Sequence, residues 1–233
     1  MKRVLVSWSS GKDSAWLVHV LRHSGDVEIG GLLTTLNESV DRVAMHAVRA
    51  ELVEAQARAL GLPLTRVGIP SPCPNEVYER AMAAAVAGAV ADGFTHVAFG
   101  DLFLEDVRRY REEKLAGTGL SPLFPLFGSD TGALAREMVA GGLGARLTCV
   151  HPPILDASFA GREFDAALLD DLPPDVDPCG ERGEFHTFAY RGPMFSRPIP
   201  IESGVVVHRD GYVFADLLLT AEDAEGAEDK SVS

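Results

Sequence analysis

The chain has 233 residues, enough for one large domain or a domain with a small appendage, and enough to bury a substantial core. Its formal net charge is −13, from 21 basic and 34 acidic residues, which argues against nucleic acid as a partner because the overall field repels phosphate backbones. No apolar run reaches the roughly 18 residues that a membrane span requires, so we expect a cytoplasmic protein with no membrane partner.

The first two thirds of the chain alternate short apolar runs with helical patterns. Strands are predicted at 4–7, 27–36, 64–69, 95–99 and 146–150. Helices are predicted at 14–23, 44–60, 75–91, 104–115 and 130–140. The strands lack strict polar alternation, as expected when both faces of a sheet are buried. Strands and helices that alternate at this spacing predict an α/β fold with a parallel five-stranded sheet.

The pattern changes after residue 152. One helix is predicted within 159–172, and three antiparallel strands at 185–191, 204–209 and 212–219, with Asp210-Gly211 as a hairpin turn. We therefore expect a nucleotide-binding domain over 1–152 and a small α+β substrate-binding subdomain over 153–220. The acidic tail 221–233 has no apolar anchor and is predicted to be disordered.

The strongest functional pattern is the loop Ser9-Ser10-Gly11-Lys12-Asp13-Ser14, between the first strand and the first helix. Small residues let backbone N–H groups converge on an anion, and the helix N-terminus adds partial positive charge. Lys12 can neutralise phosphate oxygens, and Ser9 and Ser14 can donate hydrogen bonds. The loop is not a Walker A motif, because the required earlier glycine is missing. Asp13 suits either a Mg²⁺ site or a helix cap.

A second polar segment, 99–112, begins where the fourth predicted strand ends. Ligands of open α/β sheets bind beyond the carboxyl ends of the strands. Gly100 permits close approach there, and Asp101 and Glu105 can reach a metal or a polar substrate. Alternatively, Asp101 caps a helix and Glu105 is a solvated charge. The basic run from Arg108 to Lys114 is interleaved with acids, which is typical of a solvated helix face.

A third segment, 177–187, gathers Glu181, Glu184 and His186 among glycines. Carboxylates can bind an amine or Mg²⁺, and histidine can move protons near neutral pH. The alternative is a plain polar turn before a strand. The three cysteines form no CxxC pair, which argues against a disulfide framework and a zinc site. A nucleophilic thiol at Cys179 remains an open alternative, as does the role of Cys73.

These motifs carry a family resemblance. The loop at 9–14 resembles the Ser-Gly-Gly-x-Asp-Ser loop of the PP-loop ATP pyrophosphatases, with Ser10 in place of a glycine. The segments 100–106 and 179–187 resemble the diphthine–ammonia ligase family, with Arg182 in place of the usual Asn, and 122–127 is similar to a further family segment. The likeness extends from Arg3 to Ile199. It implies an adenine-nucleotide α-hydrolase fold, which is Rossmann-like, with a small C-terminal α+β subdomain.

The resemblance also implies an activity. A substrate carboxylate attacks the α-phosphorus of ATP and releases pyrophosphate, and ammonia then displaces AMP to give an amide. ATP and Mg²⁺ are the implied cofactors. The partners are ATP, ammonia and a carboxylate acceptor, either a small molecule or a modified protein residue. Dimers are common in this fold, so a homodimer is an open expectation.

Site residues follow from the resemblance together with the patterns above. The catalytic set is Lys12, Asp13, Glu181, Glu184 and His186. The nucleotide-binding set is Ser9, Ser10, Gly11, Lys12, Asp13, Ser14, Thr34, His46, Gly100 and Asp101. The substrate-binding set is Glu105, Tyr110 and Gly183, and the metal ligands are Asp13 and Asp101.

Three other functions are weighed against this one. The chain is rich in Ala, Arg and Gly and poor in Lys, which suggests a GC-rich, bacterial genome, where amidation in corrinoid salvage is the alternative. A nucleotide-binding regulator of the universal-stress type is disfavoured by Lys12, Asp13, Asp101 and the cluster at 181–186. Transfer-RNA thiolation or lysidine synthesis is disfavoured by the acidic charge and by the missing cysteine pairs.

Overall fold

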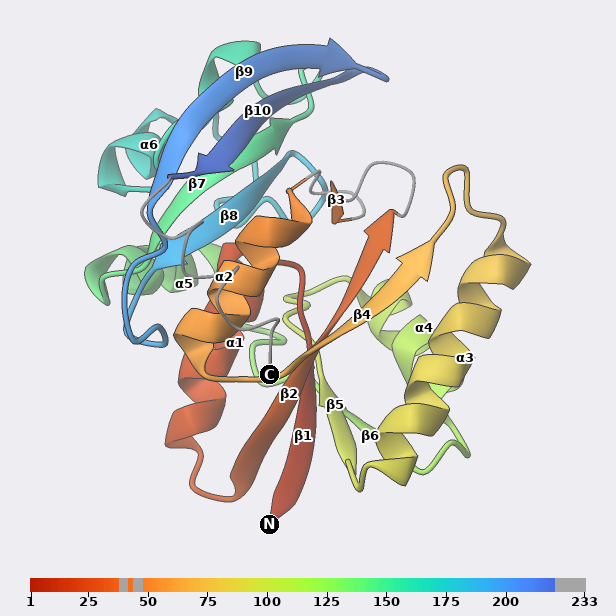
Figure 1. The fold of residues 1–233 in the computed structure, drawn as a ribbon. Helices are drawn as coiled ribbons and strands as arrows, with labels where there is room; N and C mark the ends of the chain where they lie inside the picture. Colours follow the sequence, from red (N-terminus) through yellow and green to blue (C-terminus); the bar gives the residue numbers. More distant parts are fainter. Residues whose placement is uncertain (38–41, 44–47, 221–233) are drawn as a thin grey trace.

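The computed structural model describes residues 1–37, 42–43 and 48–220. His46, expected to bind nucleotide, and the predicted tail at 221–233 lie outside the described residues. Two β-sheets and their flanking helices make up the fold (Figure 1). In the described part, no helix has both the length and the apolarity that crossing a membrane demands.

Sheet A is the mostly parallel sheet. Its parallel strands are β1 (Lys2–Ser7), β2 (Val27–Asn37), β4 (Leu64–Ile69), β5 (His96–Ala98) and β6 (Ser121–Leu123). The strands β2, β1, β5 and β6 lie side by side in this order, and β4 pairs with the other edge of β2. The short β3 (Arg42–Val43) runs antiparallel to the end of β2. The α/β prediction is confirmed, with a sheet that is mixed rather than purely parallel.

The predicted fifth parallel strand, 146–150, was assigned to the wrong sheet. It forms β7 (Gly144–Val150), which pairs antiparallel with β8 (Phe185–Arg191) and β10 (Tyr212–Leu219). A short apolar run fits a buried strand of either sheet type, so the pattern alone does not distinguish them. The fifth parallel strand is instead β6, which contains Pro122 and lies at the sheet edge, where a missing backbone donor is tolerated.

Sheet B is antiparallel, in the order β8 (Phe185–Arg191), β7, β10 (Tyr212–Leu219) and β9 (Ile201–Arg209). The three predicted C-terminal strands are therefore confirmed. Asp210 and Gly211 both have positive φ, 53° and 81°, as a two-residue hairpin turn requires. The smaller elements are α5 (Thr131–Ala140), a 3₁₀ turn (Ala157–Phe159) and α6 (Ala166–Asp171). The predicted boundary at residue 152 falls just after β7, and the division into domains remains a prediction.

Alternate residues of the sheet A strands face two different cores. Val4 and Val6 pack with α1 (Lys12–His23) and α2 (Ala50–Leu60), whereas Leu5 packs on the side of α3 (Asn75–Ala91) and α4 (Glu105–Leu115). This period of two places the helix pairs on opposite faces of the sheet (Figure 1). The helix predicted at 44–60 begins only at Ala50, and Gly61 ends it in the left-handed conformation.

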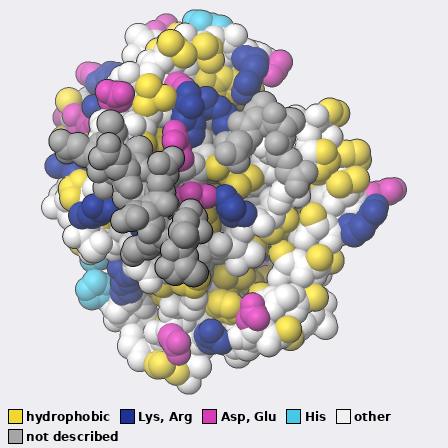
Figure 2. Space-filling model, in the orientation of Figure 1, with side chains coloured by type: hydrophobic (Ala, Val, Ile, Leu, Met, Phe, Trp, Pro, Cys, Tyr) yellow, Lys and Arg dark blue, Asp and Glu magenta, His cyan; other side chains and the backbone are white. Residues whose placement is uncertain are grey.

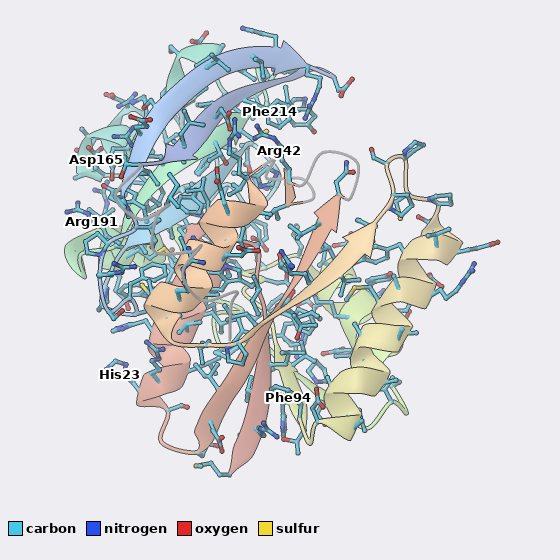
Figure 3. The ribbon with its side chains drawn as sticks, viewed as in Figure 1. His23, Arg42, Phe94, Asp165, Arg191 and Phe214 are labelled. Atoms are coloured by element: carbon cyan, nitrogen blue, oxygen red, sulfur yellow. The ribbon has the colours of Figure 1, made fainter. Side chains whose placement is uncertain are left out.

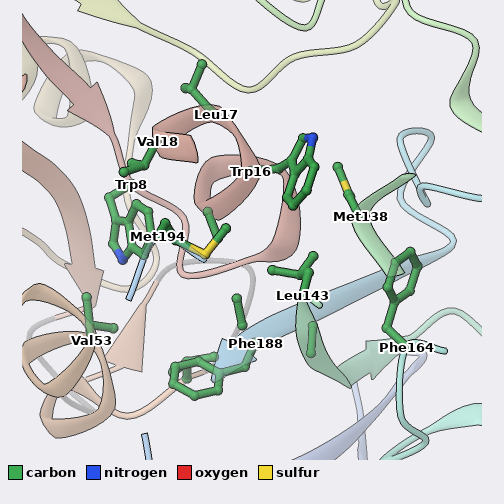
Figure 4. Close-up of a cluster of buried hydrophobic side chains, with 14 of the residues drawn as sticks. Trp8, Trp16, Leu17, Val18, Val53, Met138, Leu143, Phe164, Phe188 and Met194 are labelled. Carbon is green, nitrogen blue, oxygen red and sulfur yellow. The ribbon is translucent and has the colours of Figure 1, made fainter. Parts of the chain in front are cut away.

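The two sheets share one core. Trp8, Leu17 and Phe188 belong to the same buried cluster, so α1 and α2 are covered partly by sheet B (Figure 4). A second link is ionic. Arg42 of β3 lies near Phe214 of β10 in Figure 3, and its guanidinium pairs with Asp216 at 2.9 Å. Sheet B is thereby held against the carboxyl end of sheet A, where the strands of a parallel sheet present their ligand-binding loops.

Candidate functional site

The predicted phosphate loop joins β1 to α1. Gly11 is the N-cap of α1 and has no side chain to cap the helix. The hydroxyl of Thr187 accepts from the N–H of Lys12 at 3.1 Å, so the remaining N–H groups of the first turn are the ones that could bind an anion. The hydroxyls of Ser9 and Ser14 lie 3.1 Å apart beside it. Asp13 lies in the first turn and does not cap the helix. Of the two predicted roles for Asp13, the helix cap is therefore wrong.

Ser10 holds the loop in a strained conformation. Its φ of 69° lies in the left-handed region, which costs a residue with a Cβ atom roughly 1–2 kcal/mol. Its carbonyl accepts hydrogen bonds from the backbone N–H of Ala189 and from the side chain of Gln56, both at 2.9 Å. Its buried hydroxyl has no hydrogen-bond partner among the described residues. Glycine adopts this conformation without strain, which explains why the PP-loop motif usually has a glycine at this position.

Gln56 is a buried anchor that the sequence reading missed. Its side-chain carbonyl accepts from the indole of Trp8 at 2.9 Å, and its amide donates to the carbonyls of Ser10 and Ala189 at 2.9 and 2.6 Å. Gln56 thus ties the phosphate loop to α2 and to β8 at once. Gln56 follows Val53 by three residues and so lies on the apolar stripe of α2, and this position could have indicated that its side chain is buried.

Lys12 is only 2% exposed. Its ammonium contacts both carboxylate oxygens of Asp13, at 2.9 and 2.8 Å, and donates to the carbonyl of Cys179. It also lies 5.5 and 5.6 Å from the ring centres of Phe164 and Phe185. Burial lowers the pKa of Lys12, but Asp13, Cys179 and Glu181 together outweigh burial, and the pKa is raised. The lysine therefore stays charged while it connects the phosphate loop to the segment at 177–184.

The loop after β5 closes over the start of α1. A Cβ atom at Gly100 would lie 3.2 Å from the carbonyl carbon of Asp13, so any other residue here would require the backbone at the start of α1 to shift. Asp101 pairs with Arg111 through two contacts, at 2.5 and 3.0 Å, and the Arg111 guanidinium lies 4.3 Å from the ring centre of Phe99. The N-cap of α4 is Leu104, so Asp101 is not a helix cap.

The basic run was predicted to be a solvated helix face, and this prediction is wrong for Arg111. Arg108 does pair with Glu112 at 2.9 Å on the surface, as that reading expects. Arg111, about one helical turn after Arg108, instead pairs with Asp101 at the site. Glu105, a predicted substrate ligand, is the exposed first residue of α4.

The segment at 177–184 is a turn held by its own carboxylates. The two oxygens of Glu184 accept from the backbone N–H groups of Asp177 and Arg182, at 3.0 and 2.9 Å, and Glu184 is 1% exposed. Glu181 reaches outward, and its carboxylate accepts from the N–H of Leu102 at 2.8 Å. Gly183 has a φ of 85° within the turn. Glu184 thus orders the turn, whereas Glu181 joins it to the loop after β5.

Burial controls the protonation of this segment. It raises the pKa of Glu181 to about 7, and Asp13 and Asp101 add to that shift. Burial lowers the pKa of His186 to about 4, and the positive charge of Lys12 contributes. Burial also raises the pKa of the Cys179 thiol to about 12, and the sulfur donates to the carbonyl of Thr131. A thiol that stays protonated is a poor nucleophile, which disfavours the alternative of a catalytic Cys179.

These segments meet around a polar cavity of about 230 Å³. It is lined by Ser7, Ser9, Lys12, Asp13, Ser14, Phe99, Gly100, Asp101, Arg111, Cys179, Gly180, Glu181, Phe185, His186 and Thr187. Eight of the predicted site residues are among them. Thr34 lies elsewhere: it is buried in β2 between Leu32 and Leu36, which face the core of α1 and α2.

A second, apolar cavity of about 640 Å³ adjoins the first. It is lined by Ser7, Trp8, Ser9, Leu33, Thr35, Val43, Tyr78, Glu79, Met82, Ala83, Val86, Ala87, Val97, Phe99, Tyr110, Arg111, Lys114, Leu115 and Thr118. Four of these residues, Ser7, Ser9, Phe99 and Arg111, line both cavities. The predicted substrate residue Tyr110 lies here.

Asp13 and Asp101 both line the polar cavity, but each is already paired with a cation of the chain. Among the described residues, no group of three or more His, Cys, Asp or Glu side chains could hold a metal ion. Mg²⁺ is commonly held by one or two carboxylates together with substrate phosphates and water. Two carboxylates beside the N-terminus of a helix fit that arrangement, whereas they do not fit a metal site made by protein side chains alone.

Comparisons with known proteins agree on one family. The profile described as the diphthamide synthase N-terminal domain matches residues 1–118, and that of the diphthamide synthase C-terminal domain matches residues 130–215. A diphthine–ammonia ligase of Danio rerio is 36% identical over 115 residues, which cover 46% of this chain and 45% of the relative. The match thus spans about half the length of that relative.

Proposed function

The chain belongs to the diphthamide synthase family, and from this premise we propose that it is an ATP-dependent ligase that joins ammonia to a substrate carboxylate. One observation carries the proposal. The phosphate loop, the segment around Asp101 and the segment from Glu181 to His186 lie far apart in the sequence, yet all three line the polar cavity. The N-terminus of α1, to which we assign phosphate binding, therefore lies beside ionisable groups suited to acyl transfer.

In the proposed first step, an oxygen of the substrate carboxylate attacks the α-phosphorus of ATP, and the bond to pyrophosphate breaks. The N-terminus of α1 and the backbone N–H groups of the loop bind the phosphates. Asp13 and Asp101 would be the residues to hold the Mg²⁺ that accompanies ATP, and that ion would supply positive charge to offset the charge on the phosphate oxygens. Lys12 adds a buried positive charge and keeps the turn at 177–184 against the loop.

In the proposed second step, ammonia attacks the activated carbonyl carbon and AMP leaves. The attacking nitrogen must lose a proton. Glu181 suits this task, because a pKa of about 7 lets a carboxylate accept a proton near neutral pH. His186 stays neutral, with a pKa of about 4, so we assign it to orienting a reactant by hydrogen bonding rather than to carrying the proton. Glu184 is assigned a positioning role, since both its oxygens hold the turn.

The experiment is to identify the products of ATP. The chain is incubated with ATP, Mg²⁺, ammonium and a panel of carboxylates, and AMP, ADP, pyrophosphate and phosphate are separated. We expect AMP and pyrophosphate in equal amounts. Asp13→Ala and Glu181→Gln should each reduce the rate at least 100-fold. Arg58→Ala, an exposed change on α2, should leave the rate within twofold.

Formation of ADP would contradict attack at the α-phosphorus. Tight ATP binding with no product under any condition would instead favour a regulator without turnover. A Glu184→Gln variant separates positioning from catalysis. It should lower stability more than it lowers the rate per folded molecule, whereas Glu181→Gln should do the reverse.

A further inference from the structure

A triphosphate needs positive charge close to it, because the chain as a whole repels anions. The formal net charge is −13. On the face shown in Figure 2, the Lys and Arg side chains form small separate groups rather than one basic surface. Long-range attraction therefore does little to hold an anion, and the polar cavity must supply its own cations. Among the described residues that line this cavity, the Lys and Arg side chains are those of Lys12 and Arg111.

Lys12 has no N–H group left for a phosphate. Its ammonium carries three N–H donors, and three oxygens of the chain accept them. Two are the carboxylate oxygens of Asp13, at 2.9 and 2.8 Å, and the third is the carbonyl of Cys179. The side chain of Lys12 is also only 2% exposed, so a ligand in the cavity hardly touches it. Lys12 therefore acts on a bound phosphate through its charge rather than through a hydrogen bond.

Arg111 still has donors for a ligand. Its guanidinium carries five N–H groups, and two of them donate to the carboxylate of Asp101, at 2.5 and 3.0 Å. Its other three N–H groups donate to no atom in the part of the chain that the structure describes. The side chain is 29% exposed, and the ring of Phe99 supports it with a centre 4.3 Å from the guanidinium. Arg111 is thus held in place while half of its donors remain available.

The partner of Arg111 indicates which phosphates it can reach. Asp101 is one of the two carboxylates assigned to the Mg²⁺ that accompanies ATP, and Mg²⁺ commonly bridges the β- and γ-phosphates of a nucleotide. Because Arg111 is in contact with Asp101, these two phosphates are the ones nearest to it. The planar fork of a guanidinium fits two phosphate oxygens as it fits the two oxygens of a carboxylate. Arg111 can therefore exchange carboxylate oxygens for phosphate oxygens when Asp101 serves the metal ion.

We propose that Arg111 binds the β- and γ-phosphates of ATP, and therefore the pyrophosphate that leaves. The inference rests on the proposed function, because that function places ATP in the polar cavity. It adds a catalytic residue from α4, outside the phosphate loop and the turn at 177–184. Arg111 stabilises the charge that the leaving group gains when its bond to the α-phosphorus breaks.

The test measures the binding of pyrophosphate, ATP and AMP to the full chain by isothermal titration calorimetry, with Mg²⁺ and without an acceptor. Arg111→Gln should weaken the binding of pyrophosphate and of ATP at least tenfold, because a charged fork is lost. It should leave the affinity for AMP within twofold, because AMP lacks the two phosphates that Arg111 contacts. Arg111→Lys keeps the charge but not the fork, so it should weaken pyrophosphate binding by roughly threefold to tenfold.

Two further variants separate a phosphate contact from a structural role. Arg109→Gln is the matched control, since Arg109 lies on the same helix, is exposed and lines neither cavity. It should change each affinity by less than twofold. Asp101→Asn removes the carboxylate that competes for Arg111, so in the absence of Mg²⁺ it should tighten pyrophosphate binding at least threefold. Most of this gain should be lost when Arg111→Gln is added. If Arg111→Gln does not fold, Arg111→Lys takes its place in each comparison.

Unchanged pyrophosphate affinity in a folded Arg111→Gln variant would overturn the inference. So would equal losses for AMP and ATP, an equal gain from Asp101→Asn with and without Arg111, or a wild type that binds no pyrophosphate. The binding measurement needs no turnover. Pyrophosphate binding that depends on Arg111, without AMP formation, would therefore remove only the proposed function. AMP formation by a chain whose pyrophosphate affinity does not depend on Arg111 would remove only this inference.

Discussion

The helices α2 and α3 cover opposite faces of the same sheet, and they do so in different ways. Eight of the eleven residues of α2 are buried, whereas α3 buries one of its seventeen. The α2 face is close-packed and continuous with sheet B, and the α3 face encloses a cavity of about 640 Å³. One face is therefore filled by side chains of the chain itself, whereas the other leaves unfilled volume.

Because of this difference, one side of the site is held rigidly and the other side contains unfilled volume. The phosphate loop is anchored on the packed side, through Gln56 and Thr187, whose hydroxyl accepts from the N–H of Lys12 at 3.1 Å. The opposite side of the site is formed by α3 and α4, which enclose the apolar cavity. Reacting groups need a rigid support, whereas a ligand needs unfilled volume.

The largest expected effect compares a leucine on α2 with a methionine on α3. Leu52→Ala should lower the free energy of unfolding by about 2–5 kcal/mol, because it leaves a void in a close-packed core. Met82→Ala should lower it by about 1 kcal/mol or less, since Met82 is half-buried and already faces a cavity. Urea denaturation checks both. Equal losses would mean that α3 is packed as tightly as α2.

A smaller loss is expected at the anchor of the phosphate loop. Gln56→Ala leaves the Trp8 indole and the carbonyls of Ser10 and Ala189 without their buried partner, at a cost of about 2–3 kcal/mol. Arg58→Ala, exposed on the same helix, should change stability by no more than about 0.5 kcal/mol. The Gln56 variant should also lose affinity for ATP, measured by calorimetry. Unchanged affinity would show that the loop keeps its shape without the anchor.

The strain at Ser10 predicts that its removal will stabilise the folded state. Ser10→Gly removes a Cβ atom from a left-handed residue and deletes a buried hydroxyl, which together outweigh the added flexibility of the unfolded chain. We expect the free energy of unfolding to rise by about 1 kcal/mol. Ser10→Ala keeps the Cβ atom and deletes only the hydroxyl, so it should gain less. A glycine variant less stable than the alanine variant would contradict the strain.

The smallest effect is a pair of opposing pH dependences. The pKa of Glu181 is raised from 4.5 to about 7, so the folded state binds the extra proton and Glu181 makes stability fall as pH rises through that window. The pKa of His186 is lowered from 6.5 to about 4, so His186 makes stability rise from pH 4 to 6.5. The two slopes oppose each other in the wild type.

Each variant should expose the slope of the remaining group. Relative to the wild type, the stability of Glu181→Gln should rise more steeply with pH between 4 and 6.5, and that of His186→Gln should fall more steeply between 4.5 and 7. Urea denaturation over this range measures both. Parallel curves for the wild type and both variants would mean that neither pKa is shifted.

The sequence predicted the elements with strong local patterns. The strand, loop and helix around Lys12 and the hairpin at Asp210-Gly211 are as expected. The prediction failed where pairing with a distant strand decides which sheet a strand joins. The apolar run at 146–150 fits either sheet, and it lies in the antiparallel one.

The candidate site was predictable only in part, for a similar reason. Motifs marked the loop and the Glu181 turn, but the pairing of Asp101 with Arg111 and the anchoring role of Gln56 depend on contacts between distant segments. The apolar cavity beneath α3 could not be predicted from the sequence. An Ala-rich helix has the same pattern whether it packs on a sheet or spans a cavity.

The most direct test of the account follows oxygen from the acceptor. A carboxylate that supports AMP formation is labelled with ¹⁸O in both carboxyl oxygens and incubated with the chain, ATP, Mg²⁺ and ammonium, and the AMP is examined by mass spectrometry. Attack of the carboxylate on the α-phosphorus predicts one labelled oxygen in each AMP and one in the amide. Unlabelled AMP, with both labels retained by the acceptor, would contradict it.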